Sequence, residues 1–343
     1  MSQGDVLILK GHEVSSLLMG CESALMDIVR DAYIAHAGGE SVLPHSVFLH
    51  LPLEPKNRII ALPAYLGGEF DVAGIKWIAS IPSNSALAID RASAVVVLNS
   101  AQTGRPLAIL EGSIISAKRT AASAVLAARY LLPGPPINSV GLIGCGLINF
   151  EIVRFLLAAF PELKKIFVFD QIHQNALRFK ERVREISERV TVEVATDLNA
   201  ALCGSPLISF ATTASAPHVK DFSGVVPGST ILHISLRDLA PELLLSCDNV
   251  VDDIDHVSRA QTSLHLAEQM TGHRRFIRCA LADVLQGKAA ARAVYSAATV
   301  FSPFGLGVLD LAVAKLIYDR ASQSGLGTVV ESFLPDPWFE RAE

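Results

Sequence analysis

The feature that most constrains the fold is a glycine-rich turn in the middle of the chain, Gly144-Cys-Gly146. It follows the apolar run Val140 to Ile143 and precedes a helical pattern from Phe150 to Phe160. A strand, a Gly-x-Gly turn and a helix in this order are typical of the first βαβ unit of a Rossmann fold, where a dinucleotide pyrophosphate approaches the turn. Asn149 stands where the full motif has a third glycine, so an ordinary tight turn remains the alternative.

An acidic residue ends the second strand of this unit. The apolar run Ile166 to Phe169 is followed by Asp170. In a Rossmann fold a carboxylate at this place accepts hydrogen bonds from the adenosine ribose, and it would repel the 2′-phosphate of NADP. The alternative is that Asp170 only caps the helix after it. Since no arginine follows within the next few residues, the sequence favours NAD as the cofactor.

Strand-like and helix-like segments alternate on both sides of this point. A proline-rich stretch from Leu132 to Ile137 ends an alanine-rich helix, and we place a domain boundary there. Strands that alternate with helices indicate a parallel sheet and an α/β fold, so we expect a central Rossmann NAD-binding domain over 133–305. Six apolar runs are its expected strands: Val140 to Ile143, Ile166 to Phe169, Val190 to Val194, Leu207 to Phe210, Thr230 to Ile234 and Val250 to Val251.

The rest of the chain predicts a second domain of α+β type, made of residues 1–132 plus 306–343. A helix is expected from Ser23 to Ala37, and the clearest strands are Gly74 to Ser80 and Ala94 to Asn99. The amphipathic pattern Gly307 to Ala321 predicts a helix that crosses back onto this first domain.

Composition excludes several classes of function. Half of the residues are hydrophobic, 18% are charged and the net charge is −5, so no basic surface for nucleic acid is expected. No apolar stretch approaches the ~20 residues of a membrane span, and the charged N-terminal segment does not resemble a secretory signal. The five scattered cysteines have no C-x-x-C spacing, which predicts reduced thiols in a soluble cytoplasmic protein without a metal site.

Three charged residues are candidates for a site. Lys76 and Arg119 lie within apolar segments, and a buried cation needs an anionic partner from the protein or from a ligand. The alternative is that both side chains extend to the surface. Asp238 follows the expected strand Ile231 to Leu236, at the strand end where α/β sheets bind ligands, which makes it a candidate acid or base. An ordinary turn cap is the alternative there.

Motifs along nearly the whole chain resemble those of the ornithine cyclodeaminase and μ-crystallin superfamily. Within it, the segments GIKWIAS, RASAVVVLN and LEGSIISAKRTAASA look most like the dehydrogenases that help to make diaminopropionate for siderophores and peptide antibiotics. The matching positions are Gly74-Ile-Lys-Trp77, Pro82-x-Asn84, Thr103-Gly104-x-Pro106, Arg119-Thr-Ala-Ala122, Gly144-x-Gly146, the Asp238 segment, Ser302 and Gly307-x-x-Asp310.

The resemblance implies an NAD-dependent oxidoreductase acting on CH-NH donors. It would oxidise the secondary amine of N-(2-amino-2-carboxyethyl)-L-glutamate, and hydrolysis of the imine would give L-2,3-diaminopropionate and α-ketoglutarate. It also implies a homodimer that dimerises through the first domain, which would bind the substrate as well. By carry-over, Asp238 and Lys76 would be catalytic; Lys76, Arg119, Arg91, His50 and Pro303 would contact substrate; and Arg119, Gly144, Gly146, Leu147, Ile148, Asp170, Thr213 and Ser302 would contact the cofactor.

One departure from the family pattern concerns the substrate. The family usually has an arginine on an early strand for the substrate carboxylate, where this chain offers only His45 and His50. Two other functions therefore stay open: a cyclodeaminase or imino acid reductase, and a μ-crystallin-like protein that binds ligands without turnover. All of these readings expect one pocket between the two domains.

Overall fold

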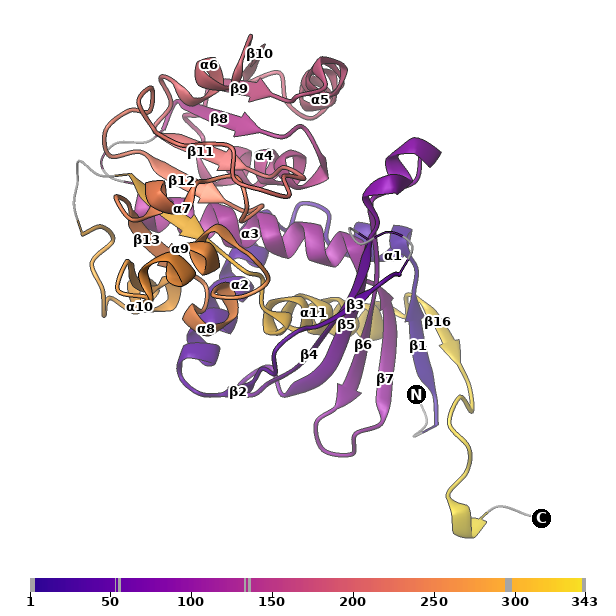
Figure 1. Cartoon of the computed structure of the whole chain (residues 1–343). Helices are drawn as coiled ribbons and strands as arrows, with labels where there is room; N and C mark the ends of the chain where they lie inside the picture. The colour runs from indigo at the N-terminus through magenta and orange to yellow at the C-terminus, as the bar shows by residue number, and fades with distance from the viewer. Residues whose placement is uncertain are drawn as a thin grey trace. The chain divides into compact units, whose positions relative to one another are not determined.

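The computed structural model describes residues 4–52, 54, 57–132, 134, 137–293 and 298–340. Within these ranges the chain divides into two compact units (Figure 1). Unit 1 is made of residues 1–21, 35–119 and 306–343, and unit 2 of residues 22–34 and 120–305. The domain boundaries expected from the sequence remain a prediction, and Pro133, Pro135 and Pro136 of the proline-rich stretch lie outside the described residues.

Unit 1 is built on a mixed sheet of eight strands among the described residues, in the order β16-β1-β7-β6-β5-β4-β2, with β3 paired to β4. All its pairings are antiparallel except that of β1 with β7. Its elements are β1 (Val6–Leu9), α1 (Gly11–Leu17), β2 (Ser41–Val42), β3 (Val47–His50), β4 (Arg58–Leu66), β5 (Val72–Ser80), η1 (Pro82–Leu87), β6 (Ala92–Ser100), β7 (Pro106–Glu111), α11 (Gly307–Ser324), β16 (Thr328–Val330) and η2 (Trp338–Glu340).

Helix α11 packs on β4, β5 and β6 of this sheet, as the sequence predicts (Figure 1). The close approach depends on Gly74, because a Cβ there would lie 2.2 Å from the Val97 carbonyl oxygen and 3.1 Å from Leu311 of the helix. The β5 residues that alternate with Gly74 on this face include Lys76 and Ser80. Lys76 and Ser80 therefore lie on the face of the sheet that α11 approaches.

Unit 2 holds a second sheet, whose eight described strands are all parallel and follow the order β10-β9-β8-β11-β12-β15-β13-β14. Its elements are β8 (Ser139–Ile143), α4 (Leu147–Ala159), β9 (Lys165–Phe169), α5 (His173–Ile186), β10 (Thr191–Val194), α6 (Leu198–Leu202), β11 (Leu207–Phe210), β12 (Thr230–His233), α7 (Pro241–Leu244), β13 (Asp248–Val251), α8 (Ile254–Val257), α9 (Ser263–Thr271), β14 (Ile277–Ala280), α10 (Leu281–Leu285) and β15 (Thr299–Ser302). Helices α2 (Glu22–Ala37) and α3 (Ser113–Leu131) contribute residues to both units.

The strand order places the switch point of a Rossmann fold between β8 and β11. The chain runs from β8 outward through β9 and β10, then returns to β11 and continues the other way. The α/β fold class with a Rossmann unit is therefore confirmed, and all six expected strands are present. Strands β14 and β15 are additional to the prediction, and β14 carries Arg278, which interrupts its apolar run.

Candidate active site

The carboxyl ends of the unit 2 strands carry most of the residues that the sequence singles out. Asp170 follows β9 and the glycine turn follows β8, while Thr212 and Thr213 follow β11. Asp238 comes five residues after β12, and Ser302 is the last residue of β15. Because these strands are neighbours and parallel, the residues line one edge of the sheet, the edge where such folds bind ligands.

The glycine turn is held in a conformation that only glycine adopts easily. Gly144 has a φ of 91°, and a Cβ at this residue would lie 2.4 Å from the Ala211 carbonyl oxygen, just after β11. Gly146 has a φ of −97° and would meet no atom within 4 Å. Gly144 is therefore required for the fold of the turn, whereas Gly146 leaves open space above the start of α4.

Asn149 replaces the third glycine of the motif and holds the turn together. Its fully buried side-chain amide donates to the carbonyl oxygens of Ile143, at 2.9 Å, and of Gly144, at 2.6 Å. Its Oδ1 accepts a hydrogen bond from the Ser209 hydroxyl of β11 at 2.8 Å. The departure from the glycine pattern thus supplies a clamp between β8 and β11.

Asp170 links the end of β9 to the same turn. One carboxylate oxygen accepts from the Cys145 backbone N–H at 2.9 Å, and the other accepts from the Ile172 N–H at 2.9 Å. The carboxylate does not cap α5, whose N-cap is Ile172, but it lies beside the glycine turn, and its role toward the ribose stays a prediction. Each carboxylate oxygen has further lone pairs that can accept from ribose hydroxyls.

The start of α4 has the properties of a dinucleotide-binding loop. Gly146 is its N-cap and supplies no side-chain hydrogen bond, so the first backbone N–H groups of the helix, at Leu147 and Ile148, have no acceptor within the helix. Such N–H groups, together with the helix dipole, favour a phosphate group. With open space over Gly146 and a carboxylate at the end of β9, the residues fit NAD.

Two glycine variants separate folding of the turn from cofactor binding. Gly144→Ala is expected to lower the free energy of unfolding by about 2 kcal/mol, because its methyl group meets the Ala211 carbonyl. Gly146→Ala should lower the free energy of unfolding by about 1 kcal/mol or less, because it changes an N-cap residue that faces open space. It should weaken NAD binding about tenfold, because its methyl group would keep the pyrophosphate from the first N–H groups of α4. Denaturant unfolding and NAD titration measure the two effects. Equal NAD affinity in Gly146→Ala and the wild type would contradict this assignment.

Asp238 lies at the centre of a buried hydrogen-bond network. Its side chain is fully buried; Thr212 donates to Oδ1 at 2.5 Å, and Ser235 donates to Oδ2. His233 Nε2 lies 3.6 Å from Oδ2, and partly exposed His218 lies 4.0 Å from Oδ1. The sequence spacing did not indicate that either histidine approaches Asp238.

The network keeps the Asp238 carboxylate ionised. Burial acts to raise its pKa, but hydrogen bonding and charge from His233, with the hydroxyls of Ser235 and Thr212, outweigh burial and hold the pKa below its usual value. An ionised carboxylate accepts protons, so the protein presents Asp238 as a base rather than an acid. Leu236, with the rare φ of 65°, lies in the turn between β12 and Asp238.

The remaining predicted residues of unit 2 lie around this network. Ser302 is buried, and its hydroxyl lies 3.3 Å from Nδ1 of His233. Pro303 follows it and is also buried, whereas Thr213 is exposed next to Thr212. His233 therefore connects Ser302 on β15 to Asp238 after β12.

In unit 1, Lys76 and Arg119 share one carboxylate. Lys76 Nζ lies 2.7 Å from Oδ2 of Asp310, and Arg119 Nε donates to Oδ1 at 3.0 Å. Lys76 Nζ also donates to the Ser116 hydroxyl at 3.1 Å. All three charged side chains are buried, so neither cation extends to the surface. Two cations and one anion leave the cluster with a net charge of +1, which suits an anionic ligand. The sequence alone did not reveal the pairing with Asp310, because Asp310 comes from distant α11.

The Lys76 ammonium loses its proton more readily than an ordinary lysine. Burial is the largest cause and the charge of Arg119 adds to it, while Asp310 opposes both, so the pKa of Lys76 falls to about 8. The cluster therefore carries its extra positive charge below about pH 8 and becomes neutral above that value.

Arg91 and His50 lie at the far end of the same sheet. Arg91 precedes β6 and donates from Nη1 to the Ser80 hydroxyl at 3.0 Å. His50 ends β3, opposite Arg58 in the register with β4. The structure thus places both residues beside the end of β5, four residues along the strand from Lys76.

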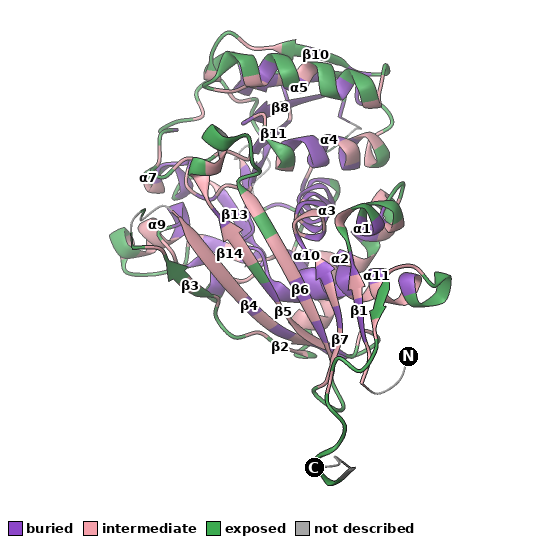
Figure 2. Ribbon diagram, turned by 90° about the vertical axis from the view of Figure 1, so that its right-hand side faces the viewer, coloured by how far each residue is buried: buried purple, intermediate pink, exposed green. Residues whose placement is uncertain are grey.

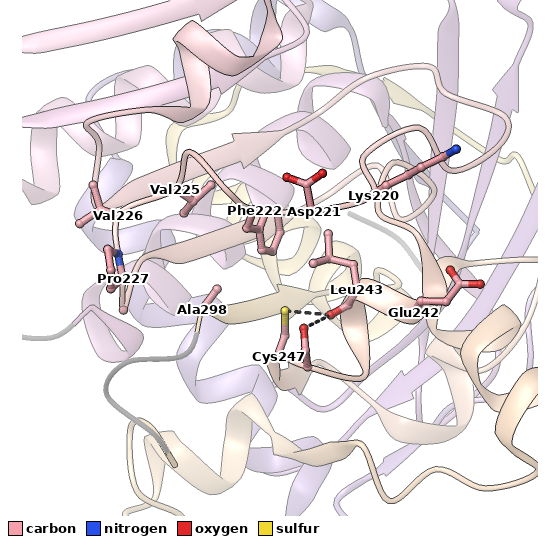
Figure 3. A pocket seen from close by; sticks show the side chains of 12 residues that line it. Lys220, Asp221, Phe222, Val225, Val226, Pro227, Glu242, Leu243, Cys247 and Ala298 are labelled. Atoms are coloured by element: carbon pink, nitrogen blue, oxygen red, sulfur yellow. Dashed lines mark hydrogen bonds between the residues drawn. The ribbon is translucent and has the colours of Figure 1, made fainter.

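A cavity of about 550 Å³ lies elsewhere in unit 2 (Figure 3). It is lined by residues that precede β12, such as Phe222 and Val225, and by Leu243 and Cys247 before β13. This is the amino-terminal edge of the strands, opposite to the edge that carries Asp238 and the glycine turn. The cavity is therefore separate from the predicted site.

Comparison with known proteins decides the family. A sequence model described as the ornithine cyclodeaminase/mu-crystallin family matches residues 5–325. The chain belongs to this family. It is 29% identical to the N-((2S)-2-amino-2-carboxyethyl)-L-glutamate dehydrogenase of Staphylococcus aureus, over 96% of this chain and 99% of that protein. It is 28% identical to the alanine dehydrogenase of Archaeoglobus fulgidus, with the same coverage of both chains.

Solved structures of relatives have the same fold. An archaeal alanine dehydrogenase dimer with bound NAD matches with a TM-score of 0.85 and 26% identity, over 95% of this chain and 99% of that one. The Δ1-pyrroline-2-carboxylate reductase of Thermococcus litoralis, with NADH and L-proline, has a TM-score of 0.87 at 24% identity, over 94% and 99% of the two chains. The sequence-based predictions of this family, of NAD as cofactor and of an NAD-dependent oxidoreductase acting on CH-NH donors are thereby confirmed.

Proposed function

We propose that the enzyme oxidises the secondary amine of N-(2-amino-2-carboxyethyl)-L-glutamate. The observation that carries the proposal is the buried group of Lys76, Arg119 and Asp310, whose extra positive charge suits a substrate carboxylate. Full-length similarity to the staphylococcal dehydrogenase supports this substrate. The place in siderophore or peptide antibiotic biosynthesis is part of the same proposal, as is a cytoplasmic location, which the five free cysteines support.

The proposed reaction gives these residues separate roles. Lys76 and Arg119 bind the α-carboxylate of the glutamate moiety, and Arg91, His50 and Pro303 contact other parts of the substrate. When bound, NAD supplies a two-electron acceptor for the C–H bond of the glutamate α-carbon. Gly144, Gly146, Leu147, Ile148, Asp170, Thr213 and Ser302, together with Arg119, hold the cofactor.

Asp238 accepts the proton that the amine nitrogen loses as the C=N bond forms. Since its carboxylate is fully buried, the proton reaches it through the hydroxyl of Thr212 or Ser235, both of which hydrogen bond to it and are only half-buried. Water then adds to the imine carbon, assisted by Lys76, and the C–N bond breaks to give L-2,3-diaminopropionate and α-ketoglutarate. One water is consumed for each two electrons transferred.

The test is a direct assay of products. Purified protein with NAD and N-(2-amino-2-carboxyethyl)-L-glutamate is expected to accumulate NADH, measured by absorbance, together with equal amounts of α-ketoglutarate and diaminopropionate, measured by mass spectrometry. Ornithine and alanine serve as comparison substrates. A cyclised product without net NADH would identify a cyclodeaminase, and no turnover of any amine would overturn the proposal.

Carboxylate binding at Lys76 is expected to weaken above pH 8. The lowered pKa of Lys76 means that the charge is present below about pH 8 and lost as the pH rises through that value. α-Ketoglutarate is a suitable probe because it has no amine that titrates. Its dissociation constant, measured by calorimetry with NADH present, should rise between pH 7 and pH 9, and Lys76→Arg should remove most of this change. A constant affinity across this range in the wild type would contradict the assigned role.

We propose that the enzyme is a homodimer joined through the outer face of the unit 1 sheet. Val47, Ala61, Trp77 and Val95 lie side by side in the strand register on the face opposite to Lys76. Trp77 is 40% exposed and Val47 is 64% exposed, and Figure 2 colours β4 to β6 largely as half-buried. An apolar face of this kind suits a second copy of the chain, and the archaeal relative is described as a dimer.

The dimer has a matched test. Trp77→Glu is expected to raise the dimer dissociation constant at least about 30-fold, or about 2 kcal/mol, because it places a charge in an apolar interface. Trp338→Glu, which alters a 75% exposed tryptophan near the C-terminus, is the control and should leave the mass unchanged. Light scattering over a range of protein concentrations measures both. A dimeric Trp77→Glu protein would argue against this face.

None of the helices in the described parts of the chain has the length and apolarity of a membrane span.

A further inference from the structure

Two arginines lie on the same sheet face as Lys76, at the other end of the strands. Arg58 is the first residue of β4 and pairs in register with Ser80, the last residue of β5. Directly opposed residues of antiparallel strands point to the same face, and so do Lys76 and Ser80, which are four residues apart on β5. The Arg91 guanidinium reaches this place from the start of β6 through its bond to Ser80.

Among the described residues, neither arginine has an acidic partner. In the described part of the chain, no carboxylate lies within ion-pairing distance of Arg58 or Arg91, and Nε of Arg58 is buried without a hydrogen bond. Burial lowers the pKa of Arg58. The pKa of Arg91 is lowered first by burial and then by the charge of Arg58, so the two cations are close enough to repel each other. Arg58 is half-buried and Arg91 is exposed, so water screens part of this repulsion, but an anion that bridges both guanidinium groups would remove it and would also give the buried Nε of Arg58 an acceptor.

The position of Arg58 is fixed by an aromatic side chain. Its guanidinium carbon lies 5.9 Å from the centre of the Phe48 ring, which also stacks on His50 with the ring centres 6.3 Å apart. Phe48 and His50 pair with Ile60 and Arg58, so both are on the face that carries Lys76. A cation held over a ring in this way loses less side-chain freedom when it binds an anion.

An apolar strip separates the arginine pair from Lys76. Ile60, Ile78 and Ala94 lie side by side in the register on this face and are half-buried. Helix α11 does not cover the strip, since it begins at Gly307, which contacts Leu62 one row further along. Four residues of strand span about 13 Å, and the long cationic side chains at both ends shorten the gap between their charges.

We propose that Arg58 and Arg91 form a second carboxylate subsite, which selects amino acid conjugates that carry a carboxylate at each end. The inference rests on the proposed function for the first subsite, where Lys76 and Arg119 hold the carboxylate next to the reacting carbon. The distal carboxylate bridges both guanidinium groups, and the carbon chain between the two ends lies on Ile60 and Ile78. A monocarboxylic amino acid leaves the arginine pair without its anion.

Two ligands of equal length test the subsite on the NADH-loaded full chain. Adipate has a carboxylate at each end and hexanoate has only one, and calorimetry measures both dissociation constants. The wild type is expected to bind adipate at least tenfold more tightly. Arg58→Gln and Arg91→Gln should each weaken adipate binding about 10- to 100-fold, the loss expected for a charged hydrogen bond, and leave hexanoate binding within twofold. Arg184→Gln, which alters an exposed arginine of α5, is the control.

The outcomes separate the subsite from the proposed substrate. If adipate binding depends on Arg58 and Arg91 but the glutamate conjugate is not oxidised, the subsite stands and the proposed function fails. If the conjugate is oxidised and its KM is unchanged in both variants, or if the wild type binds adipate and hexanoate equally, the subsite is wrong. Arg91 is exposed, so Arg91→Gln keeps the test valid should Arg58→Gln fail to fold.

Discussion

Replacing Asp238 with asparagine is expected to lower kcat at least about 100-fold while NAD binding changes less than twofold, the loss typical of a missing general base. Asparagine has nearly the same shape, and the Thr212 and Ser235 hydroxyls can rotate to meet it, so the fold should survive. What the variant loses is the group that accepts the amine proton. Steady-state kinetics with saturating NAD and amine measure kcat, and a fluorescence titration measures NAD binding.

The control for this variant is Asp221→Asn. Asp221 is an exposed carboxylate in the same unit, and hydrogen bonds from Ser223 lower its pKa. Asp221 resembles Asp238 in this respect, because hydroxyl groups also help to lower the pKa of Asp238. Its replacement should leave kcat unchanged, because Asp221 lies at the amino-terminal edge of the sheet. Wild-type turnover in Asp238→Asn would remove Asp238 from the proton transfer, whereas loss of NAD binding would give it a structural role.

The Rossmann unit is the part of the fold that the sequence predicts best. Its early strands are continuous apolar runs, because helices cover both faces of a parallel sheet, and glycine and acidic residues follow β8 and β9 at the expected places. Strand β14 is harder to predict, since four residues with Arg278 among them carry almost no periodic signal. Asn149 shows a different limit, because its role depends on carbonyl groups that only the folded turn brings together.

The candidate site depends on pairings between residues that are far apart in the sequence. The sequence predicts that the buried cations Lys76 and Arg119 need an anion, but Asp310 is 191 residues beyond Arg119, and periodicity does not relate the two. Arg58 has the same property, since only the strand register places it beside Ser80 and Arg91. The local sequence thus indicates that a buried charge needs a partner, whereas the topology of the fold decides which residue that partner is.

Asp310→Asn is expected to lower the free energy of unfolding by about 3–5 kcal/mol, the cost of removing one partner from a buried ion pair. The two cations would remain buried without their shared carboxylate. Lys76 can relieve part of the strain by losing its proton, because its pKa, already about 8, falls further without Asp310. In the variant, folded Lys76 therefore loses its proton at a pH below 8, whereas the same lysine in the unfolded chain keeps its proton. The free energy of unfolding consequently starts to rise with pH at a lower pH than in the wild type. The deficit relative to the wild type is greatest in mild acid and shrinks toward pH 8.

Helix α11 supplies a matched control for this prediction. Asp319, nine residues further along, also pairs with a lysine, Lys315, at 2.7 Å, but both side chains of this pair are partly exposed to solvent. An exposed ion pair contributes little, so Asp319→Asn should change the free energy of unfolding by about 0.5 kcal/mol or less at both pH 6 and pH 8. Urea unfolding followed by circular dichroism at pH 6 and pH 8, at one protein concentration, measures both variants. Equal losses for Asp310→Asn and Asp319→Asn would show that burial of the Lys76 cluster does not control its energy, and the charge argument for carboxylate binding would fail with it.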